Sequence, residues 1–167
     1  MYSCVLFLIL GLWTSTLADS SEDFRKCGRL AHPGARHCCK QPPPKPQRDD
    51  MEDVKECFKQ MAPPPSCEHD LCIATKKGFA TADGKLDKEA FQSLIEKTFA
   101  DSPDVVKSVK EKCINGDISK YGPSDFCDLM KLRHCFHTQI ALQCTEWDTE
   151  GHCSSMAELA KECKKLQ

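Results

Sequence analysis

Cysteine is the residue type that offers this chain the most chemistry. The sequence contains 13 cysteines among 167 residues. Thiols pair as disulfides in an oxidising compartment, or bind zinc as thiolates where they stay reduced. The chain has no Cys-x-x-Cys pair, which is the tight spacing typical of structural zinc sites. The pattern therefore favours disulfides over a metal centre.

Residues 1–18 predict the compartment. An apolar run is followed by Thr16 and Ala18 at positions −3 and −1 of a cleavage site before Asp19, as in a secretory signal peptide. The run is shorter than the roughly 20 residues needed to cross a membrane. We therefore expect a secreted protein without membrane insertion. Cys4 leaves with the signal, so 12 of the 13 cysteines remain and predict six disulfides.

A second candidate chemistry lies in His69-Asp70-Leu71-Cys72. This run resembles the His-Asp-x-Cys core of secreted phospholipases A2, in which the histidine activates water and the aspartate helps to hold calcium. The resemblance implies a glycine-rich calcium loop upstream, but this chain has three prolines at 63–65. The adjacent cysteine pair expected before the histidine is also missing. A calcium-dependent phospholipase is therefore only a minor alternative, and we expect no enzymatic activity.

The stretch from Asp83 to Asp87 is similar to the middle of a calcium-binding EF-hand loop. With Gly84 at loop position 6, Phe79 falls at position 1 and Ala90 at position 12. Calcium requires oxygen ligands at both positions, including a carboxylate at position 12. Neither side chain supplies an oxygen, so the stretch predicts a turn followed by a capped helix. We expect neither a metal nor a cofactor.

The six histidines are dispersed, apart from His134 and His137. These two lie one turn apart on a predicted helix, where they could share a metal ion, be solvated or partly buried, or titrate near neutral pH. We favour the solvated or partly buried positions, and a role of this pair in ligand release is a further hypothesis. No Gly-x-Ser-x-Gly sequence supports serine catalysis.

Helical periodicity supplies the elements that must position these residues. Apolar residues recur every three or four positions, without strand-like alternation or an internal repeat. The predicted helices are 50–61, 67–77, 87–99, 102–115, 124–143 and 156–166. We therefore predict an all-α fold, a single disulfide-cross-linked bundle of six to seven short helices around an apolar cavity. Disulfides restrict the unfolded chain, so a braced bundle tolerates an incompletely filled centre.

Several residues predict where these helices begin and end. Ser66 and Asp87 are suited to cap the second and third helices, and Gly78 follows the end of the second. Ser155 with Glu158 forms the sequence of a capping box for the last helix.

The segment 19–48 is predicted to be an irregular, proline-rich arm. It contains five prolines and the adjacent pair Cys38-Cys39. Adjacent cysteines do not easily bond to each other, so this pair is expected to reach two different elements and to pin the arm to the bundle. The expected organisation is a signal peptide over 1–18, the arm over 19–48, and a helical domain with a cysteine-bearing C-terminal tail over 49–167.

The spacing of the later cysteines resembles that of insect odorant-binding proteins, the pheromone and general odorant-binding family. Cys67 and Cys72 lie close together, forty residues separate Cys72 from Cys113, and eight separate Cys135 from Cys144. The run from 78 to 87 also resembles the family.

The additional cysteines are similar to those of the Plus-C subgroup of that family. Cys38 and Cys39 are followed by Pro42, and Cys153 and Cys163 lie in a C-terminal tail. Together with the core spacing, this resemblance covers most of the chain after the signal peptide.

The resemblance implies interlocked disulfides that join the first core cysteine to the third, the second to the fifth and the fourth to the sixth. Carried onto this sequence, it implies Cys57–Cys72, Cys67–Cys135 and Cys113–Cys144. Cys27 and Cys39 are alternatives to Cys57 as the first member. Spacing alone leaves the partners of the other cysteines open. These are Cys27, Cys38, Cys39, Cys127, Cys153 and Cys163.

The same resemblance implies a carrier of small hydrophobic molecules, such as odorants or pheromones, through aqueous fluid. A second copy of the chain and a chemosensory receptor are further candidate partners. The formal net charge of −2 gives no reason to expect nucleic acid. The expected cavity lining consists of apolar side chains on the predicted helices: Phe58, Leu71, Phe79, Phe91, Leu94, Ile95, Phe99, Val105, Val109, Phe126, Met130, Phe136 and Ile140. The alternative is a secreted, disulfide-rich interaction module of the venom or saliva type that acts on a protein partner.

Overall fold

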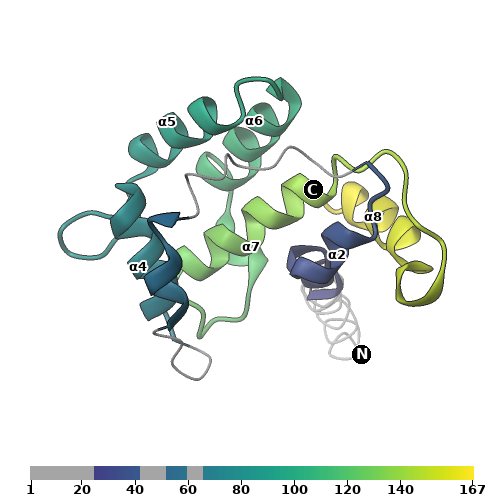
Figure 1. Ribbon diagram of the computed structural model, residues 1–167, viewed down its shortest axis with the longest axis horizontal. Coiled ribbons are helices and arrows are strands. Elements are labelled where there is room, and N and C mark those ends of the chain that lie inside the picture. The colour runs from purple at the N-terminus through teal and green to yellow at the C-terminus, as the bar shows by residue number, and fades with distance from the viewer. Residues whose placement is uncertain (1–24, 42–51, 60–65) are drawn as a thin grey trace, which may run out of the picture.

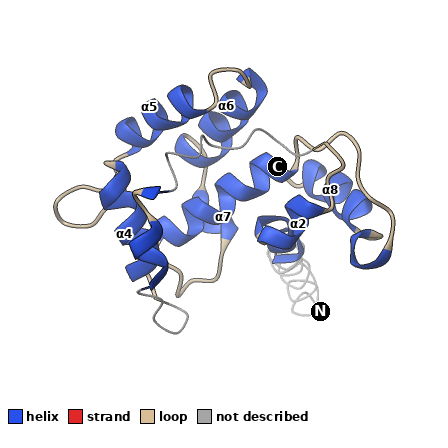
Figure 2. Ribbon diagram, in the orientation of Figure 1, coloured by secondary structure: helices blue, strands red, loops and turns tan. Residues whose placement is uncertain are grey.

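The computed structural model describes residues 25–41, 52–59 and 66–167, and within these ranges the chain is helical (Figure 2). The β pairing in these ranges is limited to two isolated bridges, Cys39 with Trp147 and Ala80 with Leu86. The predicted all-α class is therefore confirmed. The expected signal peptide, 1–18, lies outside the described residues. No helix in the described part is long and apolar enough to cross a membrane.

Helix α7, Asp128–Ala141, runs through the middle of the molecule (Figure 1). Helices α4, α5 and α6 lie towards one end of the molecule, and α2 and α8 lie at the other. The remaining helical elements are η1 Gly28–Ala31, α2 Pro33–His37, η2 Lys55–Lys59, α4 Glu68–Lys77, α5 Lys88–Thr98, α6 Pro103–Val109, the π-helical turn η3 Lys110–Ile114, η4 Ile118–Tyr121, η5 Gly151–Cys153 and α8 Met156–Lys165.

Three of the predicted helix boundaries are confirmed. Gly78 ends α4 in the left-handed region, with φ at 77°, where a residue without Cβ is favoured. Asp87 Oδ1 accepts a hydrogen bond of 2.9 Å from the backbone N–H of Ala90 and so caps α5. The helix predicted from 102 begins at Pro103, the first residue of α6, where the missing N–H of proline costs nothing.

Other predicted boundaries are wrong, one because of a local turn and one because of a contact with a distant residue. Helix α7 begins at Asp128 rather than at 124, because Pro123 accepts a hydrogen bond from Phe126 in a turn that delays the helix. The capping box of α8 does not form. Ser155 has helical φ and ψ and caps no backbone N–H, and its hydroxyl accepts a hydrogen bond from Arg29 instead. Of the helix predicted over 50–61, only 52–59 is described.

The twelve cysteines after Cys4 form six disulfides, as predicted. Cys57–Cys72 is the pair that the sequence resemblance implied. The implied pairs Cys67–Cys135 and Cys113–Cys144 are wrong. The other five disulfides are Cys67–Cys127, Cys113–Cys135, Cys39–Cys144, Cys38–Cys153 and Cys27–Cys163.

The position of α7 accounts for the corrected pairing. Cys127 immediately precedes α7, whereas Cys135 lies within it and Cys144 lies beyond its end. Cys135 is therefore placed opposite Cys113 on η3, and Cys144 is free to reach the N-terminal segment. With Cys127 and Cys135 as the fifth and sixth members, the disulfides follow the implied order of first to third, second to fifth and fourth to sixth.

The buried side chains form two clusters. The first joins α5, α6 and η3 to α7, and its members include Phe91, Val109 and Ile140. The second joins η1 and α2 to α8 and to the end of α7, around Leu30 and Leu159. The disulfides Cys27–Cys163 and Cys38–Cys153 lie within this second cluster.

The described part of the N-terminal segment is therefore not an irregular arm. It forms η1 and α2, and the Leu30 side chain is fully buried. Pro33, one of the prolines that argued against a helix here, is compatible with α2. It occupies the first position of that helix, and His32 Nδ1 caps it. The prediction for the adjacent cysteines is confirmed, because Cys38 and Cys39 bond to two different elements.

Candidate ligand-binding cavity

A cavity of about 460 Å³ lies between α2, η2, α4, α5 and α7. Its volume falls within the roughly 300–1,000 Å³ of small-molecule sites. Thirteen of its 20 lining residues are apolar, so the cavity suits a largely apolar guest. The apolar members are Pro33, Val54, Phe58, Ile73, Phe79, Phe91, Leu94, Ile95, Phe99, Leu129, Leu132, Phe136 and Ile140.

Aromatic rings form a connected cluster along the apolar side of the cavity. The ring centroids of Phe79 and Phe91 are 5.1 Å apart, and those of Phe91 and Phe136 are 6.2 Å apart. Phe99 contacts Phe136 edge to face at 5.8 Å. Because such contacts fix the rings against one another, the cluster presents a rigid apolar surface to the cavity.

The polar part of the lining runs along α7 and faces α2 and α4. Arg133 Nε lies 2.7 Å from Asp70 Oδ1, in an ion pair whose carboxylate is only 6% exposed. One turn further along α7, His137 Nδ1 is in close contact with the guanidinium of Arg36. His69, on α4, makes a hydrogen bond of 3.1 Å with the carbonyl oxygen of Cys57. Thr98 and Lys77 complete the polar lining.

Burial and neighbouring cations set the protonation of the cavity histidine. Burial, followed by Arg36, Arg133 and His134, lowers the pKa of His137 to about 3. Burial and Arg133 also lower the pKa of His134, although Asp70 acts in the opposite direction. His137 is therefore neutral at physiological pH. This charge state argues against the hypothesis that its protonation near neutral pH releases a ligand.

The structure brings eight of the predicted lining residues together around the cavity. The five that it places elsewhere have other partners. Val105 and Val109 are fully buried in the first cluster, Met130 is also buried, and Phe126 packs its ring against His134. Leu71 lies against the turn at Gly84. The eight that line the cavity are Phe58, Phe79, Phe91, Leu94, Ile95, Phe99, Phe136 and Ile140.

The residues of the lining that sequence reasoning missed are of two kinds. Leu129, Leu132 and Arg133 share the face of α7 that carries Phe136, so helical spacing could have identified them. For Arg36, no helical spacing in the sequence indicated a place in the lining. It reaches the cavity because two disulfides hold the segment after α2 against distant parts of the chain.

The residues that suggested calcium chemistry have other partners. Asp70 is paired with Arg133, and His69 also contacts the ring of Phe58 at 4.9 Å. In the EF-hand-like stretch, the carboxylate of Asp83 pairs with Lys85 at 2.7 Å. The backbone there forms a turn with Gly84 at a φ of 77°, as the sequence predicted.

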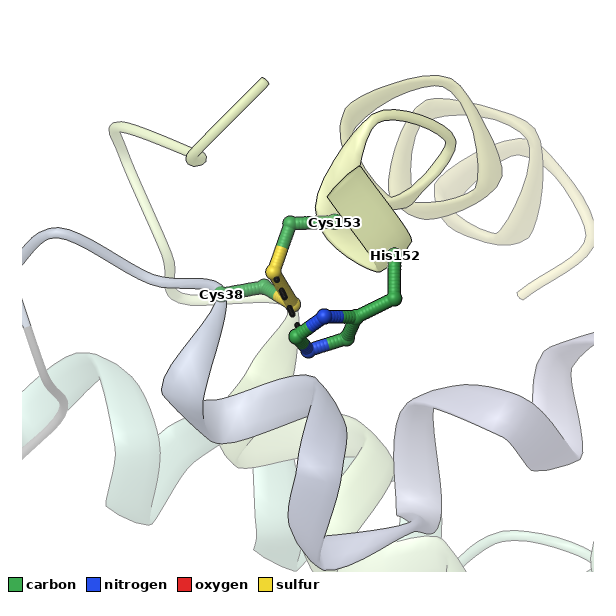
Figure 3. Close-up of side chains that lie close together, drawn as sticks. All are labelled: Cys38, His152 and Cys153. Atoms are coloured by element: carbon green, nitrogen blue, oxygen red, sulfur yellow. Dashed lines mark hydrogen bonds between the residues drawn. A yellow bond between two sulfur atoms is a disulfide. The ribbon is translucent and has the colours of Figure 1, made fainter. Parts of the chain in front are cut away.

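One group of metal-ligand residues lies close together in the described part of the chain: Cys38, His152 and Cys153 (Figure 3). The two sulfurs are joined in a disulfide, and His152 Nε2 lies 3.5 Å from Cys153 Sγ. Metal binding by cysteine requires a thiolate, which a disulfide does not offer. The predicted histidine pair is not part of this group, since His134 packs on Phe126 and His137 contacts Arg36.

No family model, curated protein or solved structure matches the chain.

Proposed function

We propose that this protein is a secreted carrier that holds a small hydrophobic molecule in the cavity described above. The observation that carries the proposal is the largely apolar cavity beside the aromatic cluster of α5 and α7. Binding would transfer apolar ligand surface out of water, at roughly 25 cal/mol per Å².

The disulfides support the proposal in two ways. Six paired bridges are typical of proteins that fold in an oxidising compartment, which agrees with the expected secretion. Three of them also follow the interlocked order of the odorant-binding family. These are Cys57–Cys72, Cys67–Cys127 and Cys113–Cys135.

The partners of the polar lining support a binding role rather than a catalytic one. Asp70 is committed to an ion pair with Arg133, and His69 to a backbone carbonyl. A calcium-dependent phospholipase would need the Asp70 carboxylate to hold calcium, and Arg133 already neutralises this carboxylate. A carrier needs no calcium, and the two side chains then fix η2 and α7 against α4.

The test is uptake of an uncharged fluorescent naphthylamine by the mature, disulfide-bonded protein, followed by displacement with medium-chain alcohols and esters. Micromolar uptake that these ligands reverse supports the carrier. No uptake would overturn it. A tight complex with another protein, together with no uptake, would instead favour the secreted interaction module.

Filling part of the cavity should weaken uptake. Leu94 lines the cavity from α5 and is only partly buried, so Leu94→Trp adds bulk to the cavity without displacing a fully packed side chain. We expect probe affinity to fall by at least about tenfold, because the indole occupies the volume that the probe needs. The matched control is Leu166→Trp, at an exposed leucine outside the cavity lining, and it should bind the probe like the wild type. Equal affinity in all three proteins would place the probe elsewhere.

A further inference from the structure

The wall of this largely apolar cavity contains a second guanidinium group besides that of Arg133. Arg36 is on α2, directly before the cysteine pair whose disulfides fix this helix to the C-terminal part of the chain. Its side chain is half-buried and lines the cavity beside His137. Burial lowers the pKa of this guanidinium, although an arginine remains charged at physiological pH.

The charges around Arg36 do not balance. Among the described residues, its hydrogen-bond partner is the ring of His137, and no carboxylate there forms an ion pair with it. Asp70, which also lines the cavity, is already paired with Arg133, and His137 is neutral because of its low pKa. A cation taken partly out of water without a counterion costs free energy unless an anion neutralises it.

We propose that the ligand of this cavity is an amphipathic carboxylate, whose acid head group binds the guanidinium of Arg36. The inference rests on the proposed carrier function and specifies its ligand class. The guanidinium fork matches both oxygens of a carboxylate, and charge-assisted bonds of this kind are stronger than those between neutral groups. An alcohol or an ester offers no charge to Arg36.

The expected position of the acid head group, at Arg36 and His137, lies next to the aromatic cluster. His137 and Phe136 are consecutive on α7, and their ring centroids are 5.3 Å apart. Phe136 in turn contacts Phe91 and Phe99, so an aliphatic tail that leaves Arg36 meets the aromatic cluster at once.

The cavity volume guides the choice of tail length for a test ligand. About 460 Å³ holds roughly fifteen non-hydrogen atoms, at the ~30 Å³ that one water molecule occupies in the liquid. A saturated carboxylic acid with about twelve carbons matches this size.

The experiment compares three ligands of equal chain length: dodecanoate, dodecanol and dodecylamine. Each displaces the fluorescent naphthylamine from the mature protein at neutral pH, where the acid is ionised. We expect dodecanoate to bind the wild type at least about tenfold more tightly than dodecanol, and the amine to bind least tightly.

Variants at Arg36 assign the preference to this side chain. Arg36→Met keeps a long, unbranched side chain but removes the charge, so the acid and the alcohol should bind about equally well. Arg36→Lys keeps the charge without the fork and should restore part of the preference for the acid. The matched control is Arg29→Met, at an exposed arginine of the same N-terminal segment, which should retain the full preference.

The outcomes separate this inference from the function on which it rests. Equal binding of acid and alcohol by the wild type, with the probe still bound, overturns the carboxylate inference and leaves the carrier in place. A preference for the acid that survives in Arg36→Met, with native circular dichroism, also overturns it. Failure of the wild type to take up the probe overturns the carrier itself.

Discussion

Replacement of Cys67 and Cys127 together by alanine is expected to lower the free energy of unfolding by about 4 kcal/mol. This disulfide closes a loop of 60 residues, and the entropy that a cross-link removes from the unfolded chain rises with the logarithm of loop length. The same change at Cys57–Cys72, which closes a loop of 15 residues, is expected to cost about 3 kcal/mol. Denaturant unfolding under non-reducing conditions measures both differences.

A single substitution tests the pairing itself. In Cys67→Ala, the thiol that becomes free should be that of Cys127, and alkylation under denaturing conditions followed by peptide mass analysis identifies it. A free thiol at Cys135 would contradict the structure and restore the pair that the sequence resemblance implied. Cys57→Ala is the control, because it should free Cys72 under either pairing.

The second large effect is the loss of folding stability at acidic pH. The pKa of His137 is about 3 in the folded protein, whereas an unfolded histidine titrates near 6.5. Below about pH 6.5 the unfolded chain therefore binds a proton that the folded protein does not. The folded protein therefore has its full contribution from neutral His137 above about pH 6.5, the pKa of the unfolded histidine. As the pH falls from there towards 3, the free energy of unfolding decreases by up to about 1.4 kcal/mol per pH unit.

We therefore expect His137→Gln to lose less stability than the wild type on acidification, by about 2 kcal/mol between pH 6 and pH 4. Glutamine can still accept a hydrogen bond from Arg36. The measurement is urea unfolding at several pH values, with the difference between the two proteins taken at each pH, so that groups common to both cancel. Parallel stability curves for the two proteins would contradict the low pKa.

Arg36→Met provides an internal check on the cause of this effect. The charged groups that lower the pKa of His137 are Arg36, Arg133 and His134, after burial itself. Loss of the Arg36 charge should raise the pKa of His137 and reduce the acid sensitivity of the protein, but less than His137→Gln does. A carboxylate ligand at Arg36 should act in the same direction, since an anion favours the protonated imidazole.

The helices from α4 to α8 and most of their boundaries could be predicted from the sequence, because their signals lie within a few residues. Gly78 ends α4 and Asp87 caps α5 through contacts that span three or four positions. Where a distant residue competes, local reasoning failed. The capping box at Ser155 is lost to Arg29, which is more than a hundred positions away in the chain.

The choice of disulfide partners shows the same limit. Seven residues separate Cys127 from Cys135 and eight separate Cys135 from Cys144, so spacing hardly distinguishes the two candidate pairs of fifth and sixth cysteines. The structure distinguishes them because α7 begins after Cys127 and ends before Cys144. Where a helix begins decides which side chains reach its neighbours.

By itself, the sequence determined the all-α class, the number of disulfides and most of the apolar side of the cavity. Each of these depends on composition or on periodicity along one helix. Only the tertiary structure revealed that the N-terminal segment is part of the core and that Arg36 meets His137 beside the aromatic cluster. The physical reason is that a contact between residues 101 positions apart depends on how whole elements pack, and no local pattern encodes that packing.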